Sequence, residues 1–367
     1  MALQLISSIA TFLYGGTITA LYYGLLKLKT NSIQQKPLTT FSIIIPFRDE
    51  EDSLQKLFNS LLAIDYPVSL FEVIAVNDHS SDASVSLLEE LQAENPELKL
   101  RILHSPEPSK KAALTFGISQ AEYPWIVTTD ADCCVPKYWL QQFNSIISYN
   151  KVTLIAGPVS CNSNKSFLEE FQRLDFLSLQ GTTMGIFGLN VPFMCNGANL
   201  CYSKAAFNTV GGFEGNEHIA SGDDVFLLEK IVRKYPKQIH YSKTIENSVI
   251  SEPQKSWKKL ISQRMRWAGK ASAYSNPFGI IIGCIVLVCN VLLLVLLITD
   301  PLVSAILFFT KGVLDYIFLQ KTGKIFQQSI GMQSFVLSAL LYPFFSSIIF
   351  IASQLGTFRW KGRVLKR

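Results

Sequence analysis

The sequence predicts an α/β domain, built on a mostly parallel sheet flanked by helices, that is held between membrane-spanning segments. Short β-rich runs alternate with helical segments from Phe41 to Asp130. Repeated strand–helix–strand units imply parallel strands joined by right-handed crossovers. The strongly apolar stretches lie outside this region, in Ala2–Leu26 and in most of Pro277–Leu355. We therefore expect an anchored globular domain followed by a helical membrane region.

The composition also indicates a membrane protein. Of the 367 residues, 49% are hydrophobic and only 17% are charged, whereas soluble domains carry roughly 25% charged residues. The mean hydropathy is +0.25. The apolar excess is confined to the two ends, and the roughly 250 residues between them have an ordinary globular composition, which is enough for one or two domains.

Charge and cysteine content narrow the possible functions. The net charge of +5 is not clustered into a stripe of the kind that binds nucleic acid. Lysines and arginines gather near the membrane ends instead, which favours contact with anionic cytoplasmic head groups and no nucleic-acid partner. The seven cysteines form no CxxC pair and no metal-binding spacing, so we expect reduced thiols rather than disulfides.

The first part of the chain is expected to be an uncleaved transmembrane helix. Ala2–Leu26 carries no charge and is followed by Lys27 and Lys29, which places its C-terminal end in the cytoplasm. The expected parts are an N-terminal transmembrane helix at 1–29, a globular domain at 30–254, an interfacial helix at 255–276, membrane helices at 277–356 and a basic tail at 357–367. This order predicts an integral membrane protein, in a bacterial inner membrane, whose globular domain is cytosolic.

Local patterns predict the elements of the globular domain. Strands are expected at Phe41–Phe47, Phe71–Asp78, Leu98–His104, Trp125–Asp130 and Lys151–Val159. Helices are expected at Glu50–Leu62, Asp82–Glu94, Ser109–Gln120 and Val225–Val232. Ser166–Leu179 has the pattern of an amphipathic helix that either packs on the core or lies on the head-group plane, and a Gly-rich aromatic segment follows it.

Acidic side chains follow the strands at the points where the strands end. Asp49 and Glu50 follow the first strand, Asp78 ends the second, and Asp130 and Asp132 follow the fourth. The carboxyl ends of parallel strands share one edge of a sheet, and ligands bind beyond that edge. Two carboxylates that flank one small residue can share a divalent cation with substrate phosphates. Taken alone, the Asp-x-Asp spacing is equally compatible with a turn after a strand.

Two helix starts carry further candidate residues. Lys110 and Lys111 oppose the helix dipole, which suggests an anionic partner such as a diphosphate, although a solvated lysine pair is the simpler alternative. Asp223 and Asp224 precede an apolar helix and are compatible with ordinary helix capping. Adjacent carboxylates also repel each other, which can raise the pKa of one of them as a general base requires.

A polar helix face precedes the C-terminal membrane segments. Gln263, Arg266 and Trp267 fall at positions i, i+3 and i+4, so one face presents an amide, a guanidinium and a flat ring. This face is either an interfacial anchor or a platform for a sugar or a phosphate.

Three apolar segments follow, at Phe278–Ile298, Leu302–Leu319 and Gly331–Leu355. The second carries Lys311 and Asp315, an intramembrane pair that indicates a functional or packing role. If all three segments cross the membrane, the basic tail lies outside, against the positive-inside tendency. Gly331–Leu355, which contains a proline, is therefore the candidate for a re-entrant or interfacial segment.

These residues together resemble the membrane-bound family-2 glycosyltransferases, which include cellulose and hyaluronan synthases and ceramide glucosyltransferase-like enzymes. The matching motifs, in order, are Pro46, Val76–Asp82, Lys110 with Lys111, Asp130 with Asp132, Gly222–Asp224, and Gln263 with Arg266 and Trp267. The chain departs from the family pattern at Asn77, which replaces an aspartate, and at Asp223, where glutamate is frequent. Recognition of the nucleobase would then rest on Asp78.

The resemblance implies a GT-A fold and an inverting single displacement. It implies Mg²⁺ or Mn²⁺ held by Asp132, with Asp130 near the ribose and the metal, and it makes Asp224 the base that deprotonates the acceptor. It assigns substrate binding to Pro46, Asp49, Glu50, Asp78, Lys111, Asp130, Asp223, Gln263, Arg266 and Trp267. The donor is expected to be a nucleotide sugar, UDP-linked, and the acceptor a membrane lipid or a lipid-linked glycan. A processive polysaccharide synthase and a catalytically silent nucleotide-sugar-binding scaffold are the alternatives.

Overall fold

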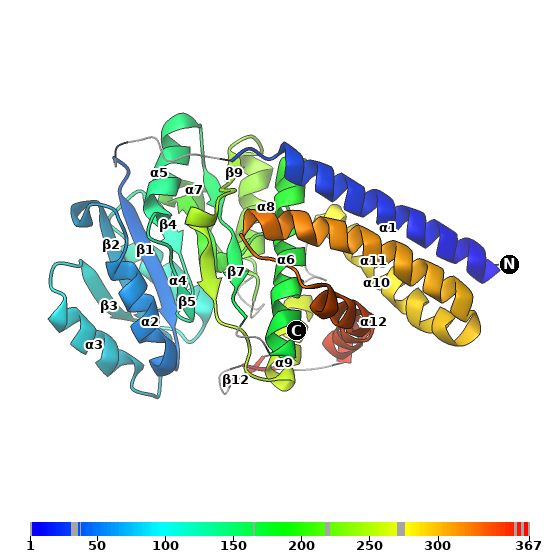
Figure 1. The fold of residues 1–367 in the computed structure, drawn as a ribbon. Helices are drawn as coiled ribbons and strands as arrows, with labels where there is room; N and C mark the ends of the chain where they lie inside the picture. The colour runs from blue at the N-terminus through cyan, green and yellow to red at the C-terminus, as the bar shows by residue number, and fades with distance from the viewer. Residues whose placement is uncertain are drawn as a thin grey trace.

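The chain forms a sheet domain from which three long helices extend together on one side (Figure 1). The computed structural model describes residues 2–30, 36, 38–163, 166–216, 221–269, 276–355, 358–360 and 363–365. The predicted α/β class, with apolar helices at both ends of the chain, is confirmed.

The central sheet has seven strands in the order β3-β2-β1-β4-β8-β6-β9. These strands are β1 Phe41–Phe47, β2 Phe71–Asn77, β3 Leu100–His104, β4 Trp125–Thr128, β6 Leu154–Ala156, β8 Leu200–Ser203 and β9 Ile239–Tyr241. Strands β1 to β4 run parallel to one another, as predicted. Strand β8 is antiparallel to β4 and β6, so the sheet is mixed in its second half.

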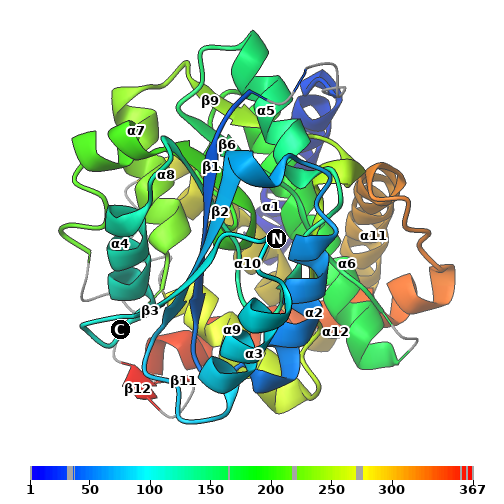
Figure 2. The ribbon, with the colours of Figure 1, turned by 90° about the vertical axis from the view of Figure 1, so that its left-hand side faces the viewer.

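Helices cover both faces of this sheet. In Figure 2, α4 Lys110–Gln120, α7 Lys204–Thr209 and α8 Asp223–Lys234 lie on one side, and α2 Glu51–Leu62, α3 Ser84–Glu94 and α5 Trp139–Tyr149 lie on the other. Alternation along β1 explains both layers, because Ile44 joins the cluster that contains α4 and α8, whereas Ile43 and Ile45 join the cluster that contains α2 and α5. Short 3₁₀ turns lie at Val68–Leu70, Gly197–Asn199 and Ile245–Asn247.

Four strand predictions were too long. Strand β2 ends at Asn77 and not at Asp78, and β3 begins at Leu100 and not at Leu98. The predicted strand Trp125–Asp130 ends at Thr128, which leaves both DxD aspartates in the following loop. The predicted strand Lys151–Val159 is divided into β6 and β7 Val159–Cys161, because Pro158 has no amide hydrogen for a ladder. Strand β7 joins a second sheet of order β5-β10-β7, with β5 at Cys133–Cys134 and β10 at Val249–Ser251.

Helix α6, Phe167–Gly188, is a core helix and not a surface one. It is longer than the predicted segment and continues through its glycines, and most of its side chains are buried. The close approach of α6 to the first helix requires glycine, since a Cβ atom at Gly188 would lie 1.9 Å from the carbonyl oxygen of Gly24. Of the two alternatives for this segment, packing on the core is the one observed.

Within the part of the chain that the structure describes, four helices are long and apolar enough to cross a membrane: α1 Ala2–Lys27, α10 Pro277–Thr299, α11 Pro301–Ile325 and α12 Met332–Leu355. Helices α1, α10 and α11 pack side by side. Figure 1 shows α12 nearly end-on beside these three, so it lies across them and not along them. Pro343 lies inside α12 without ending it. The hairpin of β11 Phe358–Trp360 and β12 Arg363–Leu365 follows; the rest of the predicted basic tail is outside the described residues.

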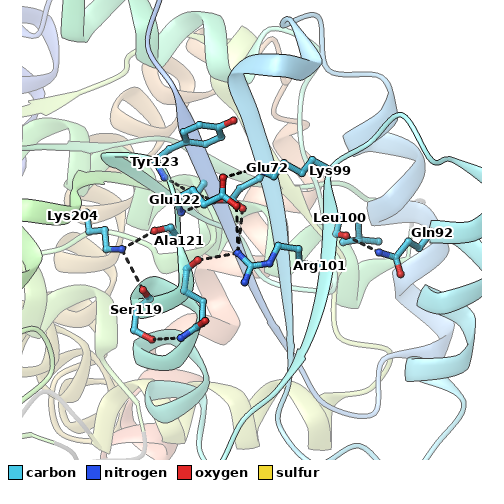
Figure 3. A network of polar contacts seen from close by, with 12 residues as sticks. Glu72, Gln92, Lys99, Leu100, Arg101, Ser119, Ala121, Glu122, Tyr123 and Lys204 are labelled. Carbon is cyan, nitrogen blue, oxygen red and sulfur yellow. Dashed lines mark hydrogen bonds and ion pairs between the residues drawn. The ribbon is translucent and has the colours of Figure 1, made fainter.

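Charged residues also occur at the amino-terminal edge of the sheet, where they pair with one another (Figure 3). The carboxylate of buried Glu72 accepts hydrogen bonds from Ser42 at 2.6 Å and from the amide of Glu122 at 2.7 Å, and it lies 3.5 Å from Arg101. Lys99 pairs with the Glu122 side chain. The acids of this edge therefore have structural partners.

Helix α9, Trp257–Gly269, is fastened to α6 by a buried ion pair. Arg264 Nη2 lies 2.6 Å from Asp175 Oδ2, and both side chains are only 6% exposed. The Arg264 guanidinium also stacks over Trp267, 4.2 Å from the ring centroid, and Trp267 meets Phe176 edge to face. This pair fixes the helix that carries the Gln-x-x-Arg-Trp motif. The remainder of the predicted interfacial helix, 270–275, is outside the described residues.

Replacing Arg264 by Met is expected to destabilise the protein by about 3–5 kcal/mol, because Asp175 would remain as an uncompensated buried charge. The thermal midpoint of the purified protein, followed by tryptophan fluorescence, would then fall. The double variant Arg264→Met with Asp175→Leu is expected to recover most of the loss. Lys99→Met, which removes an exposed ion pair, is the control and is expected to leave the midpoint unchanged. A midpoint equal to the wild-type value in Arg264→Met would contradict this assignment.

Candidate active site

The loops after β1 and β2 hold each other at the carboxyl edge of the sheet. Arg48 Nη1 donates to the carbonyl oxygen of Asp78 at 3.0 Å, and the amide of Ser81 donates to Asp49 Oδ1 at 2.7 Å. Asp49 and His79 adopt left-handed backbone conformations, with φ of 48° and 57°. These contacts fix the positions of Asp49 and Asp78, whose side chains both line one large cavity.

Asn77, which departs from the family motif, shapes its loop instead of lining the cavity. Its Oδ1 accepts a hydrogen bond from the amide of Ser80 at 2.8 Å, and its Nδ2 lies 3.2 Å from His104 Nδ1. The neighbouring Asp78 is buried and lines the cavity. The loop can therefore present Asp78 without an aspartate at the preceding position.

The aspartates of the later motifs line the same cavity, which has a volume of about 1810 Å³. Lys110 Nζ lies 2.6 Å from Asp130 Oδ1 and 3.7 Å from Asp223 Oδ2, so it bridges two motifs that are distant in sequence. Burial by itself would lower the pKa of Lys110, but attraction to Asp130 and Asp223 raises that pKa above its ordinary value. Lys110 therefore remains a cation among the carboxylates.

Two backbone amides orient Asp224, which lies at the start of α8. Its Oδ1 accepts from the amide of Val225 at 2.8 Å, and its Oδ2 accepts from the amide of Gly197 at 3.1 Å. Gly197 packs closely against the acidic pair, since a Cβ atom there would lie 3.2 Å from Asp223 Oδ2. The carboxylate of Asp224 is thus held in one orientation at the cavity wall.

The predicted polar face of α9 faces the same cavity as the aspartates. Gln263, Arg266 and Trp267 all line the cavity. Burial lowers the pKa of Arg266, and attraction to all four aspartates at positions 130, 132, 223 and 224 acts in the opposite direction. The guanidinium therefore lies within electrostatic reach of the whole acidic cluster, where it can meet an anionic ligand.

Most of the predicted site residues are brought together. The cavity is lined by Pro46, Asp49, Glu50, Asp78, Asp130, Asp132, Asp223, Asp224, Gln263, Arg266 and Trp267. Lys111 is placed differently: its ammonium donates to the carbonyl and side-chain oxygens of Asn216 and lies 5.1 Å from the ring centroid of Phe226. Lys110 lines the cavity instead, because adjacent residues of a helix point about 100° apart.

The donor set suits a metal that the substrate helps to bind. Among the described residues, no three His, Cys, Asp or Glu side chains are grouped closely enough to hold a metal ion by themselves. Asp130 and Asp132 line the cavity, and Asp130 is already paired with Lys110. Mg²⁺ is ordinarily bound by one or two carboxylates together with substrate phosphates. The residues present therefore fit a cation whose remaining ligands come from a diphosphate.

The sequence patterns did not reveal two residues that the site needs. Asp175 and Arg264 place the Gln-x-x-Arg-Trp helix, yet neither belongs to a motif that suggests chemistry. One signal was available, because Asp175 lies between the apolar residues Leu174 and Phe176, all three of which are buried, and a charge in such a position requires a partner.

Comparison with known proteins agrees with this geometry. The model of glycosyl transferase family 21 matches residues 12–366. Among curated proteins, the glycosyltransferase AglE of Haloferax volcanii is 25% identical over 61% of this chain and 70% of its own length. The poly-β-1,6-N-acetyl-D-glucosamine synthase of Staphylococcus epidermidis is 24% identical over 62% of this chain. The alignment spans only 53% of that synthase.

A solved structure shares the fold across nearly the whole chain. The mannosyltransferase PcManGT of Pyrobaculum calidifontis, in complex with GDP-Man and Mn²⁺, superposes with a TM-score of 0.59 and 16% sequence identity. The superposition covers 96% of this chain and 98% of that one. The family match extends over nearly all of the sequence and confirms the resemblance drawn from the motifs: the chain belongs to glycosyl transferase family 21 and is a glycosyltransferase of the family-2 type.

Proposed function

We propose that the protein is an inverting, metal-dependent glycosyltransferase that moves a sugar from a UDP-sugar to a membrane lipid or a lipid-linked acceptor. The observation that carries this proposal is the convergence of Asp78, Asp130, Asp132 and Asp224 on one cavity with Lys110 and Arg266. A nucleoside diphosphate bound there would present its phosphates to the two cations. PcManGT, which shares the fold, was solved with GDP-Man and Mn²⁺.

The roles of the residues follow from their positions in the cavity. Asp132, with Asp130 beside it, would hold Mg²⁺ or Mn²⁺, and the bound cation would neutralise charge on the departing diphosphate. Arg266 would contact the same diphosphate from the side of α9, while Asp78 would meet the nucleobase. Asp224, held by two backbone amides, would accept the proton of the acceptor hydroxyl as that oxygen attacks the anomeric carbon.

A lipid acceptor is favoured because the cavity does not end at the aspartates. It continues along α6 to residues of α10, α11 and α12, such as Gly283, Leu319 and Ala339. Helices α1, α10 and α11 would span the membrane, with α12 lying at its cytosolic surface. This arrangement places the globular domain and the basic tail together in the cytosol, in accordance with the positive-inside tendency.

Two alternative functions differ from this proposal, one in its acceptor and the other in having no catalytic turnover. In a processive polysaccharide synthase, the same cavity would hold a growing glycan. In a silent scaffold, nucleotide sugar would bind without release of UDP.

Asp224→Asn is expected to lower sugar transfer by a factor of about one hundred to ten thousand, because the amide cannot accept the acceptor proton. Release of UDP from a UDP-sugar panel by purified protein in membranes, with products identified by mass spectrometry, measures this loss. Asp65→Asn, at an exposed position outside the cavity, is the matched control. A wild-type protein that binds nucleotide sugar but releases no UDP would favour the scaffold, and full activity of Asp224→Asn would refute the assigned base.

Asp132→Asn is expected to weaken Mn²⁺ binding in the presence of UDP by about tenfold to a hundredfold, because a charged ligand is lost. Electron paramagnetic resonance of free Mn²⁺ during a titration gives the affinity directly. Asp224→Asn is expected to retain the wild-type affinity, since its role is proton transfer. Equal losses in the two variants would argue against separate roles for these carboxylates.

A further inference from the structure

The membrane side of the cavity has walls suited to a hydrocarbon chain. They are formed in large part by Ile282, Val286, Leu287, Phe318, Leu319 and Phe335. At Gly283, which also lines the cavity, an added methyl group would meet no atom within 4 Å. This open apolar space is continuous with the position of Asp224. A molecule with its reactive group at Asp224 can therefore extend its apolar part between α10, α11 and α12.

A polar cluster lies at the far end of this space. Lys311 Nζ lies 2.5 Å from Asp315 Oδ2, and the hydroxyl of Tyr14 donates to Asp315 Oδ1 at 2.5 Å. Lys311 also lies 5.0 Å from the ring centroid of Tyr14 and 5.9 Å from that of Tyr342. The cluster thus joins α1 to α11, and all four residues line the cavity.

The order of residues along α11 places this cluster away from the domain. Phe318 and Leu319 belong to the hydrophobic cluster shared with the sheet domain, whereas Lys311 lies about 12 Å further along the helix, at 1.5 Å per residue. Lys311, Asp315, Phe318 and Leu319 all face the same cavity. Along α11 the lining therefore changes from apolar, near the sheet domain, to polar, further along the helix.

Extending a hydrocarbon chain past the cluster would not make its binding free energy more favourable. The side chains of Lys311 and Asp315 remain 10% and 20% exposed, and covering them with hydrocarbon would remove their remaining polar surroundings. The pair is internally neutral and both carboxylate oxygens have partners. Its effect on an apolar occupant is therefore to end the space available to it.

We propose that the cluster of Tyr14, Lys311 and Asp315 is the floor of the acceptor site and limits the length of hydrocarbon that the site accepts. The occupant is a long-chain lipid alcohol whose hydroxyl lies at Asp224, and in this respect the inference rests on the proposed function. The apolar wall selects an acceptor with a hydrocarbon chain, and the distance from Asp224 to the floor limits the length of that chain.

Photolabelling of the full-length protein in lipid nanodiscs tests this inference without any nucleotide sugar. The probe is a long-chain alcohol with a terminal diazirine, and unlabelled alcohols from decanol to octadecanol compete with it. Labels are expected next to the floor, on α1, α11 and α12 beside Tyr14, Lys311 and Tyr342, and competition is expected to strengthen with chain length up to a limit. Replacing the pair by Lys311→Leu with Asp315→Leu is expected to move that limit to longer alcohols. The exchanged pair, Lys311→Asp with Asp315→Lys, retains a polar floor and is expected to keep the wild-type limit.

A second variant tests the wall independently of the floor. Gly283→Leu is expected to reduce labelling about tenfold by filling the open space. Gly16→Leu is the matched control, since Gly16 is exposed on α1, does not line the cavity, and has nothing within 4 Å of an added methyl group. Labels outside the cavity, an unchanged length limit in the Leu pair, or full labelling of Gly283→Leu would each overturn the inference. Normal labelling without any sugar transfer would instead contradict the proposed function alone.

Discussion

The contact between Lys110 and Asp130 is the interaction on which the acidic edge of the sheet depends. The aspartates that face the cavity include Asp130, Asp132, Asp223 and Asp224, and carboxylates at short separation repel each other. Lys110 offsets part of this repulsion by pairing with Asp130 and approaching Asp223, and Arg266 adds a second positive charge from the side of α9. The remaining negative charge suits a divalent cation, and the two side-chain cations suit a diphosphate.

Two parts of the structure, the sheet domain and α9, together form the site, so their relative positions must be fixed. The sheet domain supplies the aspartates, while α9, which packs against α12, supplies Arg266 and Trp267. The buried pair of Arg264 and Asp175 joins α9 to α6, and α6 packs closely on α1 through glycines. A single chain of contacts therefore runs from α1 through α6 to α9, which carries Arg266 and Trp267.

The sequence was sufficient for the parts of the fold that local patterns determine. The alternation of strands and helices predicted the parallel half of the sheet, and the position of each acid after a strand predicted a shared edge. The antiparallel β8 was not predicted, because its direction depends on pairing with β4 and β6 and not on its own four residues. The choice between Lys110 and Lys111 was not predictable either, since it depends on the rotation of α4 about its axis.

The direction of α12 is a second feature that local sequence patterns could not predict. Hydropathy identifies the helix, and the basic tail raised the question of its direction, but only tertiary packing on α6, α9 and α10 places it across the other three helices. This placement also lets α12 form one wall of the cavity, through residues such as Ala339 and Tyr342.

An experimental structure with UDP and Mn²⁺, in which anomalous scattering locates the metal, is the most direct test of this account. The account predicts one Mn²⁺ beside Asp132, with the diphosphate between that ion and Arg266 and the acceptor side of the cavity open toward α10 and α12. A metal or a diphosphate bound away from Asp132, with Asp224 facing neither, would contradict it.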